Sequence, residues 1–441
     1  LGTNSIKDTG YDVANSCRFN AGSSDSLTRT LGTPTNNKKW TYSFWIKHCD
    51  NVGNLLNTGS DTAYIYFRPN NANPAPYGFS IEQYVGGFQY RIIPNMVFTD
   101  HSAWRHIVIA FDTTQGTDTN RVKVYNNGTQ ITSFNTATYP SQNLDTQVNS
   151  AVSHKIGGFA SGADFDGYMS EVCFIDGQQL AADQFGEFDE DSGIWKPIDV
   201  SGLTFGNNGF YLDFENSGAL GADVSGESNN FTVNNLTAID QTTDTCTNNF
   251  ATWNPLWSQS NGNIGDVVFS EGNLKTTTST NYRTFPATIG FSSGKWYWEI
   301  KRYEDTADMH TGVMSELATP ANTATWIGST NNGWVFGCDG GSTYGDGVEG
   351  NTGYSSAPNA GDIIQVAFNA DDGKIYFGVN GTWQNSGNPA TGTNPAYTGL
   401  DTSLFYFPCA STGSDVEGNF GNPSFAISSG NTDGDGYGNF E

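Results

Sequence analysis

The sequence predicts an all-β protein of two tandem antiparallel β-sandwiches, or jelly rolls, which an extended connector joins. Three observations lead to the all-β class, and a length of 441 residues allows two large domains of this class. Apolar and polar residues alternate with a period of two in many short segments, as they do in half-buried strands. Asn-Gly and Asp-Gly pairs separate several of these segments, as in β-hairpins. Aromatic residues, which are favoured in strands, make up 14% of the 441 residues, and no long amphipathic helical pattern is present.

Residues 1–195 are predicted to form the first sandwich. Its clearest strand is expected at 40–47, where the sequence WTYSFWIK alternates cleanly. A hairpin is expected at 121–131, turning at Asn127-Gly128. Further strands are expected at 104–111, 155–159 and 166–180.

These elements together resemble a laminin-G-like, concanavalin A-type jelly roll. The resemblance rests on the SFW strand, the Trp-Arg-His strand, the Tyr-Asn-Asn-Gly hairpin and the late Asp-Gly-Tyr-Met-Ser-Glu-Val strand, and it covers about residues 11–195. It implies a sandwich but no particular activity, because lectins, glycosidases, adhesion modules and virion parts share this fold.

Residues 196–255 are predicted to be a connector that packs along both sandwiches, because a segment of this length without folding of its own is unusual. Its sequence GFYLDF, at 209–214, is rich in aromatic residues. We expect such side chains, outside either sandwich, to be assembly contacts. The candidates are Phe210, Tyr211, Leu212, Phe214 and Phe231.

Residues 256–427 are predicted to form the second sandwich, followed by a polar, Gly-rich tail at 428–441. The segment 361–383 is expected to be two strands joined by a type I′ turn at Asp372-Gly373, with an Asn380-Gly381 turn after the second strand. The other two motifs are GKWYWEIK at 294–301 and LFYFPCAS at 404–411, which VEGNFG follows at 416–421.

The order of these motifs resembles the SPRY domain, in the version found in fibre-like and other structural proteins of tailed bacteriophages. The resemblance implies a sandwich that binds partners through loops at one edge and has no catalytic site. A laminin-G-like domain, an NNFATWNPL-type connector and a SPRY domain in this order are similar to a marine-phage structural protein.

Net charge and cysteine spacing exclude several classes of protein. The formal net charge is −26, whereas nucleic acids and anionic membranes are bound through basic patches. No apolar run approaches the ~20 residues of a membrane helix. Six scattered cysteines without a Cys-x-x-Cys pair predict reduced thiols rather than a zinc site. No signal peptide is visible, and the terminus at Leu1 is expected to be processed or incomplete.

No catalytic residues are predicted. Glycosidases of this fold carry Glu-x-Asp-x-x-Glu on one strand, and the nearest match is Glu187, Asp189, Glu190 and Asp191, with Ser192 where the last acid should stand. This run is expected to be a solvated acidic loop.

Single polar residues within strands are also interpreted as structural. Glu171 and Glu299 each suggest a hydrogen bond or a salt bridge within a sheet. His106 suggests an exposed or hydrogen-bonded sheet histidine, because it alternates with Ile107 and Ile109, which are expected to point inward. The sequence also has no Gly-x-Ser-x-Gly elbow of a serine nucleophile.

Two kinds of binding site stay open at the level of sequence. Laminin-G-like domains often hold one calcium ion, which takes six to eight oxygen ligands. The candidates for it are Asp112, Asp118, Asn120, Asp164 and Asp166. A second acidic run, Asp433-Gly434-Asp435-Gly436, lacks the later Glu of an EF-hand. Trp326, Trp334 and Tyr344 are candidates for binding a sugar or a protein. The alternative is that these aromatic side chains are buried in the core.

The favoured function is a non-enzymatic virion structural protein of a tailed phage: a fibre, spike or surface-decoration component on the virion surface, assembled in the host cytoplasm. Its expected partners are other virion proteins, host-surface glycan and further copies of itself, with a trimer favoured. The alternatives are a glycan-cleaving virion enzyme on the first sandwich and a cellular lectin or adhesion protein.

Overall fold

The computed structural model describes residues 10–50, 53–59, 62–68, 78–159, 162–257, 267–278, 283–305, 308–318, 326–329, 332–434 and 436–441. In these residues the regular structure consists of β-strands and short 3-10 helices, which confirms the all-β fold class. The chain divides into one compact unit that ends at Asn249 and a second that begins at Phe250. None of the helices in this part of the chain is long and apolar enough to cross a membrane.

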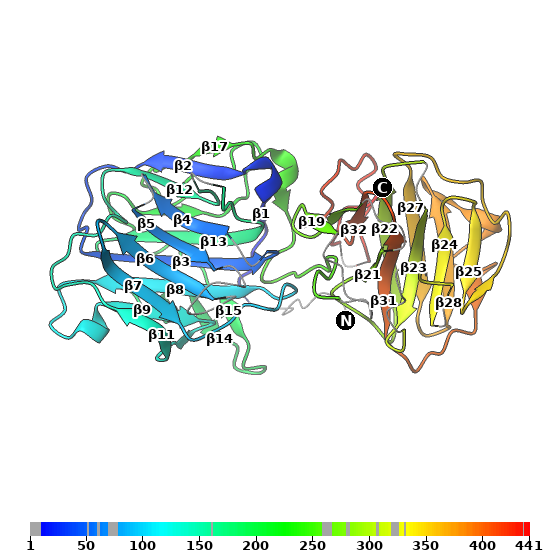
Figure 1. Ribbon diagram of the computed structural model, residues 1–441, viewed down its shortest axis with the longest axis horizontal. Helices are drawn as coiled ribbons and strands as arrows, with labels where there is room; N and C mark the ends of the chain where they lie inside the picture. The colour runs from blue at the N-terminus through cyan, green and yellow to red at the C-terminus, as the bar shows by residue number, and fades with distance from the viewer. Residues whose placement is uncertain are drawn as a thin grey trace. The chain divides into compact units, whose positions relative to one another are not determined.

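Two antiparallel sheets face each other in the first unit (Figure 1). We call them the β3 sheet and the β6 sheet. The β3 sheet runs β10 (Thr129–Gln130), β9 (Val122–Asn126), β8 (Arg105–Asp112), β3 (Lys39–His48), β13 (Gly167–Asp176), β1 (Ser16–Phe19) and β18 (Gln241–Thr242), and β16 (Phe210–Leu212) also pairs with β13. The β6 sheet runs β11 (Phe134–Thr138), β7 (Phe88–Pro94), β6 (Phe79–Tyr84), β5 (Ala63–Phe67), β4 (Gly53–Thr58), β12 (Ser153–Ile156), β2 (Ser26–Thr30) and β17 (Thr232–Asn234).

Short elements complete the first unit. A two-stranded ribbon of β14 (Gly186–Phe188) and β15 (Trp195–Pro197) forms a separate small sheet. The 3-10 helices are η1 (Ala21–Ser23), η2 (Asp118–Asn120), η3 (Ala182–Gln184) and η4 (Ala238–Asp240).

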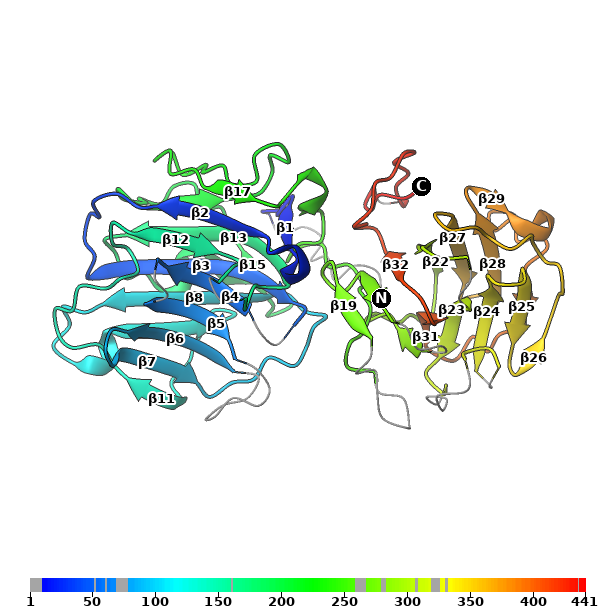
Figure 2. The same cartoon turned by 45° about the horizontal axis from the view of Figure 1, so that its top comes forward.

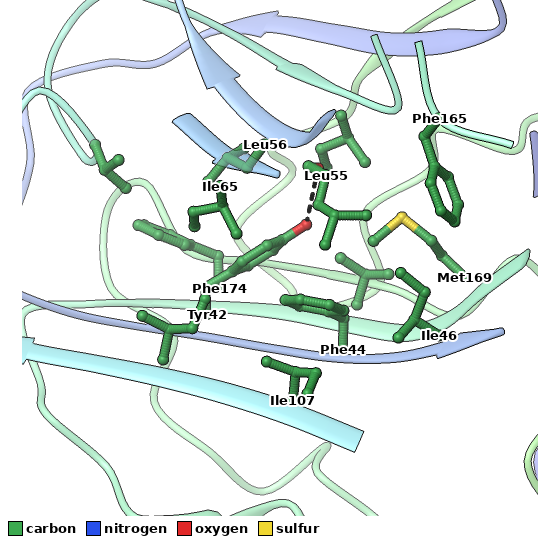
Figure 3. Packing of buried hydrophobic residues seen from close by; sticks show 14 of the residues in the cluster. Tyr42, Phe44, Ile46, Leu55, Leu56, Ile65, Ile107, Phe165, Met169 and Phe174 are labelled. Carbon is green, nitrogen blue, oxygen red and sulfur yellow. Dashed lines mark hydrogen bonds between the residues drawn. The ribbon is translucent and has the colours of Figure 1, made fainter. Parts of the chain in front are cut away.

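The main core of the first unit lies between the two sheets. Tyr42, Phe44 and Ile46 point inward from β3, as their alternation predicts, and meet apolar side chains from both sheets (Figure 3). The Tyr42 hydroxyl donates a hydrogen bond to the Leu55 carbonyl at 3.5 Å, so the one polar atom of this group has a partner. Burial of such side chains supplies most of the driving force for the sandwich.

The opposite face of the β3 sheet is buried as well, although alternation alone predicts a solvated face. Trp45 and Val108 on this face pack against Phe185, Trp195 and a further set of apolar residues from the segment that follows β13. Later parts of the chain thus cover a sheet face that the local pattern leaves open.

The segment 196–255 is not a separate connector, because up to Asn249 it belongs to the first unit. Its strands β16, β17 and β18 extend the sheets by pairing with β13, β2 and β1. Phe214 and Phe231 join the main core, and Tyr211 joins the cluster on the opposite face of the β3 sheet. These three side chains are 2%, 6% and 6% exposed, which corrects the prediction that they are assembly contacts.

A buried ion pair fastens the end of this segment to the β3 sheet. The Lys47 ammonium lies 2.8 Å from an Asp244 carboxylate oxygen, and both side chains are fully buried. The same ammonium donates to the Asn249 side chain, and the Trp104 indole N–H donates to the second Asp244 oxygen, each at 2.8 Å. Both charges are therefore hydrogen-bonded as well as paired, as buried charges require.

The second unit is also a pair of antiparallel sheets (Figure 2). The β22 sheet runs β19 (Val268–Ser270), β20 (Lys275–Thr277), β32 (Val416–Asn419), β22 (Lys295–Arg302), β27 (Ile363–Asn369), β28 (Lys374–Val379) and β29 (Thr382–Trp383), and β30 (Tyr397–Thr398) also pairs with β28. The β23 sheet runs β21 (Arg283–Pro286), β31 (Tyr406–Thr412), β23 (Met309–Ser315), β24 (Gly333–Gly337), β25 (Ser342–Gly345) and β26 (Val348–Glu349), and η5 spans Gln384–Ser386.

One predicted hairpin turn differs from the structure. Asn369 pairs with Lys374, so β27 and β28 are joined by a four-residue loop, and only Gly373 in it has a positive φ, of 59°. The prediction of a type I′ turn at Asp372-Gly373 was therefore wrong. The longer loop is held locally, because the Asp372 amide donates to the Asn369 side chain at 3.1 Å and the Gly294 amide donates to Asp371 at 2.9 Å.

The two Asn-Gly turns have the backbone that the sequence predicts. Asn127 and Gly128 have φ angles of 45° and 76°, and Asn380 and Gly381 have φ angles of 47° and 78°. Two successive positive φ angles are the signature of a type I′ turn.

The tail 428–441 packs on the second unit. Asn431 and Phe440 form an isolated β-bridge, and Phe440 is buried. The Glu441 amide donates to the Glu299 carboxylate at 3.1 Å.

Candidate functional site

The acidic run after η3 forms a charged hairpin. Glu187 lies on β14 opposite Lys196, whose ammonium is 3.3 Å from Glu187 and 3.5 Å from Asp189. Asp189 also accepts hydrogen bonds from the Ser192 amide and hydroxyl, and these bonds lower the pKa of its carboxyl. A carboxyl held in its charged form in this way suits a surface turn better than the general acid of a glycosidase, whose pKa is raised.

Glu171 occupies a strained position in β13. The pairing with β3 shifts between Ser170 and Cys173, which marks a β-bulge, and Glu171 has a φ of +50° within it. Its carboxylate accepts hydrogen bonds from the hydroxyls of Tyr211 at 2.7 Å and Tyr11 at 3.0 Å. Burial raises the pKa of Glu171 to about 7. The carboxyl is enclosed by the two phenols, so it ties three chain segments together, in the hydrogen-bonding role that the sequence suggests.

Glu299 has a similar role in the second unit. Its buried carboxylate accepts hydrogen bonds from the Tyr297 hydroxyl at 2.6 Å, the Asn419 side chain at 2.8 Å and the Glu441 amide. Burial is the main cause that raises the pKa of Glu299.

His106 is fully enclosed beside Ser43, but the arrangement is not that of a nucleophile and its base. The Trp195 indole N–H lies 2.9 Å from His106 Nδ1, which must therefore accept. In the neutral ring Nε2 then carries the proton and donates it to the Ser43 hydroxyl at 2.8 Å. Burial lowers the pKa of His106 to about 3, which keeps the ring neutral. A base would need a free lone pair facing the serine, so His106 is a hydrogen-bonded core residue.

The structure does not bring the calcium candidates together. Asp112 pairs with Lys39 at the first residue of β3, whereas Asp164 and Asp166 precede Gly167, which pairs with the last residue of β3. This strand has ten residues, so the two groups are separated by about 30 Å. Asp112 is also ion-paired with Lys39 at 3.1 Å. The five candidates are Asp112, Asp118, Asn120, Asp164 and Asp166.

No group of three His, Cys, Asp or Glu side chains that could hold a metal occurs within the described ranges. Asp435, from the second acidic run, lies outside the described residues. None of the six cysteines, all of which lie in the described residues, forms a disulfide.

The three aromatic candidates of the second unit lie on two faces of the β23 sheet. Trp326 stacks on His310 with ring centres 3.8 Å apart, and Tyr344 meets Trp326 edge-on at 4.6 Å. Trp334 points to the opposite face, toward Tyr406 and the core of the unit. Burial lowers the pKa of His310 to about 4, so this ring is a neutral stacking partner. The structure thus brings together Trp326 and Tyr344 and separates Trp334 from them.

A further surface, which was not among the sites predicted from the sequence, lies on the outer face of the β6 sheet. Tyr64, Glu82 and Arg91 stand opposite one another on β5, β6 and β7, with their side chains directed away from the main core. Glu82 Oε1 accepts from Arg91 Nε at 2.9 Å and from Arg68 Nη1 at 3.3 Å. Burial and the Glu82 charge raise the pKa of the Tyr64 phenol to about 12.

The hairpin that joins β6 and β7 ends this face with exposed apolar residues. We call Tyr84, Val85 and Phe88 the aromatic tip; their exposed fractions are 48%, 52% and 42%. The sequence signal that could have identified this surface is the alternation of Ser80, Glu82 and Tyr84 in FSIEQY. It places polar and aromatic residues on the sheet face turned away from the core.

Comparisons with known proteins identify a domain in each unit. Residues 21–183 match the concanavalin A-like lectin/glucanases superfamily, and residues 295–423 match the SPRY domain. The chain therefore contains a concanavalin A-like domain followed by a SPRY domain, and together they point to a binding or adhesion module.

Solved structures that match include the SPRY domain of human HERC1, with 19% identity, a TM-score of 0.30, and coverage of 38% of this chain and 96% of that chain. They also include the TRIM65 PSpry domain, with 10% identity, a TM-score of 0.28, and coverage of 38% and 88%. No curated protein matches this chain.

Proposed function

We propose that this chain, with its concanavalin A-like and SPRY domains, is a non-enzymatic binding protein on the surface of a tailed-phage virion. In this role it attaches the particle to host-surface glycan or to neighbouring virion proteins. The observation that carries the binding role is the outer face of the β6 sheet, where an aromatic tip adjoins an ordered network of Arg and Glu side chains. Exposed aromatic and arginine side chains are the residues that most often carry binding energy.

The virion location rests on the resemblance to marine-phage structural proteins. Antibodies raised against the purified protein should label fibres, spikes or the capsid surface of particles in electron micrographs. Labelling of host-cell envelopes in uninfected cultures, with none on particles, would instead support a cellular lectin or adhesion protein.

The absence of catalysis is part of the same proposal. Purified protein incubated with host polysaccharides should release no reducing ends, because Glu187 and Asp189 are ion-paired and Glu171 is enclosed by two tyrosines. Turnover that Glu187→Gln or Glu171→Gln abolishes would show that the glycan-cleaving alternative is correct.

We also propose that the protein works as a homo-oligomer, with a trimer favoured by the symmetry usual for such virion parts. Contacts between copies then involve surfaces other than the buried Tyr211, Phe214 and Phe231. Sedimentation equilibrium should give a mass above that of one chain, and a monomer at all concentrations would contradict this part of the proposal.

A further inference from the structure

The aromatic tip of the β6 sheet is exposed in the part of the chain that the structure describes. A Cβ atom added at Gly86 or Gly87, in the turn between its strands, would meet no described atom within 4 Å. The rings of Tyr84 and Phe88 lie 5.1 Å apart in an edge-to-face arrangement, so they support each other although both are exposed. The tip thus offers two ordered ring surfaces to solvent.

Arg91 lies directly beside this tip and is fixed from two sides. Its guanidinium carbon is 4.6 Å from the centre of the Phe88 ring, and its Nε donates to Glu82 at 2.9 Å. Glu82 is itself anchored by Ser80 and Arg68, and its side chain is only 2% exposed. An arginine held in this way loses less conformational freedom when it binds a ligand.

The two terminal nitrogens of Arg91 remain available. No acceptor for Nη1 or Nη2 is found among the described residues, and the side chain is 23% exposed. Two parallel N–H donors in one plane match the two oxygens of a carboxylate. Arg68, Arg91 and Glu82 together carry one net positive charge, on a protein whose net charge is −26.

We propose that this face binds an acidic saccharide, with a sugar carboxylate on the Arg91 fork and the apolar face of the sugar ring against Phe88 and Tyr84. This inference rests on the proposed binding function and names its ligand class and site. Three exposed apolar side chains are few for a protein partner, which usually covers about 800 Å² on each side. The strongly negative net charge disfavours an anionic membrane surface.

The test compares two oligosaccharides that differ only in the sugar carboxylate. Calorimetric titration of the full chain with β-1,4-oligoglucuronate should show binding that weakens with added salt, whereas the cello-oligosaccharide of equal length should bind at least about tenfold more weakly. Arg91→Lys keeps the charge and removes the fork, and should weaken oligoglucuronate binding about tenfold or more. Tyr84→Ala and Phe88→Ala should each weaken it about two- to tenfold.

Matched controls lie elsewhere on the same unit. Lys123→Ala removes a half-buried positive charge from β9, and Phe188→Ala removes an exposed ring from β14; both should bind as the wild type does. The melting temperature of each variant shows whether it is folded. If Phe88→Ala does not fold, Tyr84→Ala tests the ring contact in its place.

Three results would overturn the inference. Equal binding of both oligosaccharides, or wild-type affinity in folded Arg91→Lys, would place saccharide binding elsewhere and leave the proposed function standing. Binding of neither oligosaccharide would also reject the inference, and the labelling of particles would then decide the proposed function separately.

Discussion

Replacing Glu171 with Gln should remove a pH dependence from the stability of the first unit. The pKa of Glu171 is raised from 4.5 to about 7, chiefly by burial and further by the charges of Asp213 and Glu215, against the effect of the Tyr11 and Tyr211 hydroxyls. Because the folded pKa lies above the unfolded value, the unfolded chain releases this proton first as the pH rises. The wild-type unit therefore loses stability between about pH 4.5 and pH 7, and little more above that window.

The size of this loss follows from the two pKa values. The gap between 4.5 and about 7 corresponds to about 3 kcal/mol, at about 1.4 kcal/mol for each pH unit. In a unit of this size, about 3 kcal/mol changes the melting temperature by roughly 6–12 °C. A glutamine keeps an acceptor for the tyrosine hydroxyls and carries no charge at any pH.

Differential scanning calorimetry of the full chain at several pH values between 4.5 and 8 measures the effect. As the pH rises over this range, the melting temperature of the first unit in Glu171→Gln should rise relative to that of the wild type, by roughly 6–12 °C. Glu190→Gln is the matched control, because it removes the same charge from an exposed side chain and should follow the wild type. A constant difference between Glu171→Gln and the wild type over this range would refute the reasoning.

Three further predictions concern stability. Phe214→Asp places a charge in the main core and should lower the free energy of unfolding of the first unit by about 3–5 kcal/mol. It should therefore unfold this unit rather than dissociate folded subunits, and circular dichroism and sedimentation distinguish these results. Lys47→Met should cost about 3–5 kcal/mol in urea unfolding because it strands a buried carboxylate, whereas Lys38→Met, at a solvent-exposed ion pair, should change little. Equal losses would contradict this assignment. Gly381→Ala should lower the free energy of unfolding by about 1–2 kcal/mol, because alanine would adopt a positive φ in open space. Gly128→Ala should lower it further, because its Cβ would also lie 2.2 Å from a ring carbon of the Trp195 indole. Equal decreases in melting temperature would contradict this packing argument.

The sequence determined the features of this protein that depend on neighbouring residues. Alternation within WTYSFWIK placed Tyr42, Phe44 and Ile46 in the core, because successive side chains of a strand point to opposite faces. Asn-Gly pairs predicted two tight turns, and both turns have the two successive positive φ angles that such residues tolerate. The two sandwiches followed from the length of the chain and from the resemblance of its ordered motifs to two known domains.

Only the tertiary structure decided which distant segments meet. Burial of Tyr211 and Phe214 depends on β16 pairing with β13, and local sequence does not encode a partner so far along the chain. The calcium candidates looked like one set, but β3 holds Asp112 and Asp166 at opposite ends. Arg91 became a candidate ligand-binding residue only when folding placed it against Phe88 and a buried carboxylate, since hydrogen bonds and ring contacts across strands are made by three-dimensional register.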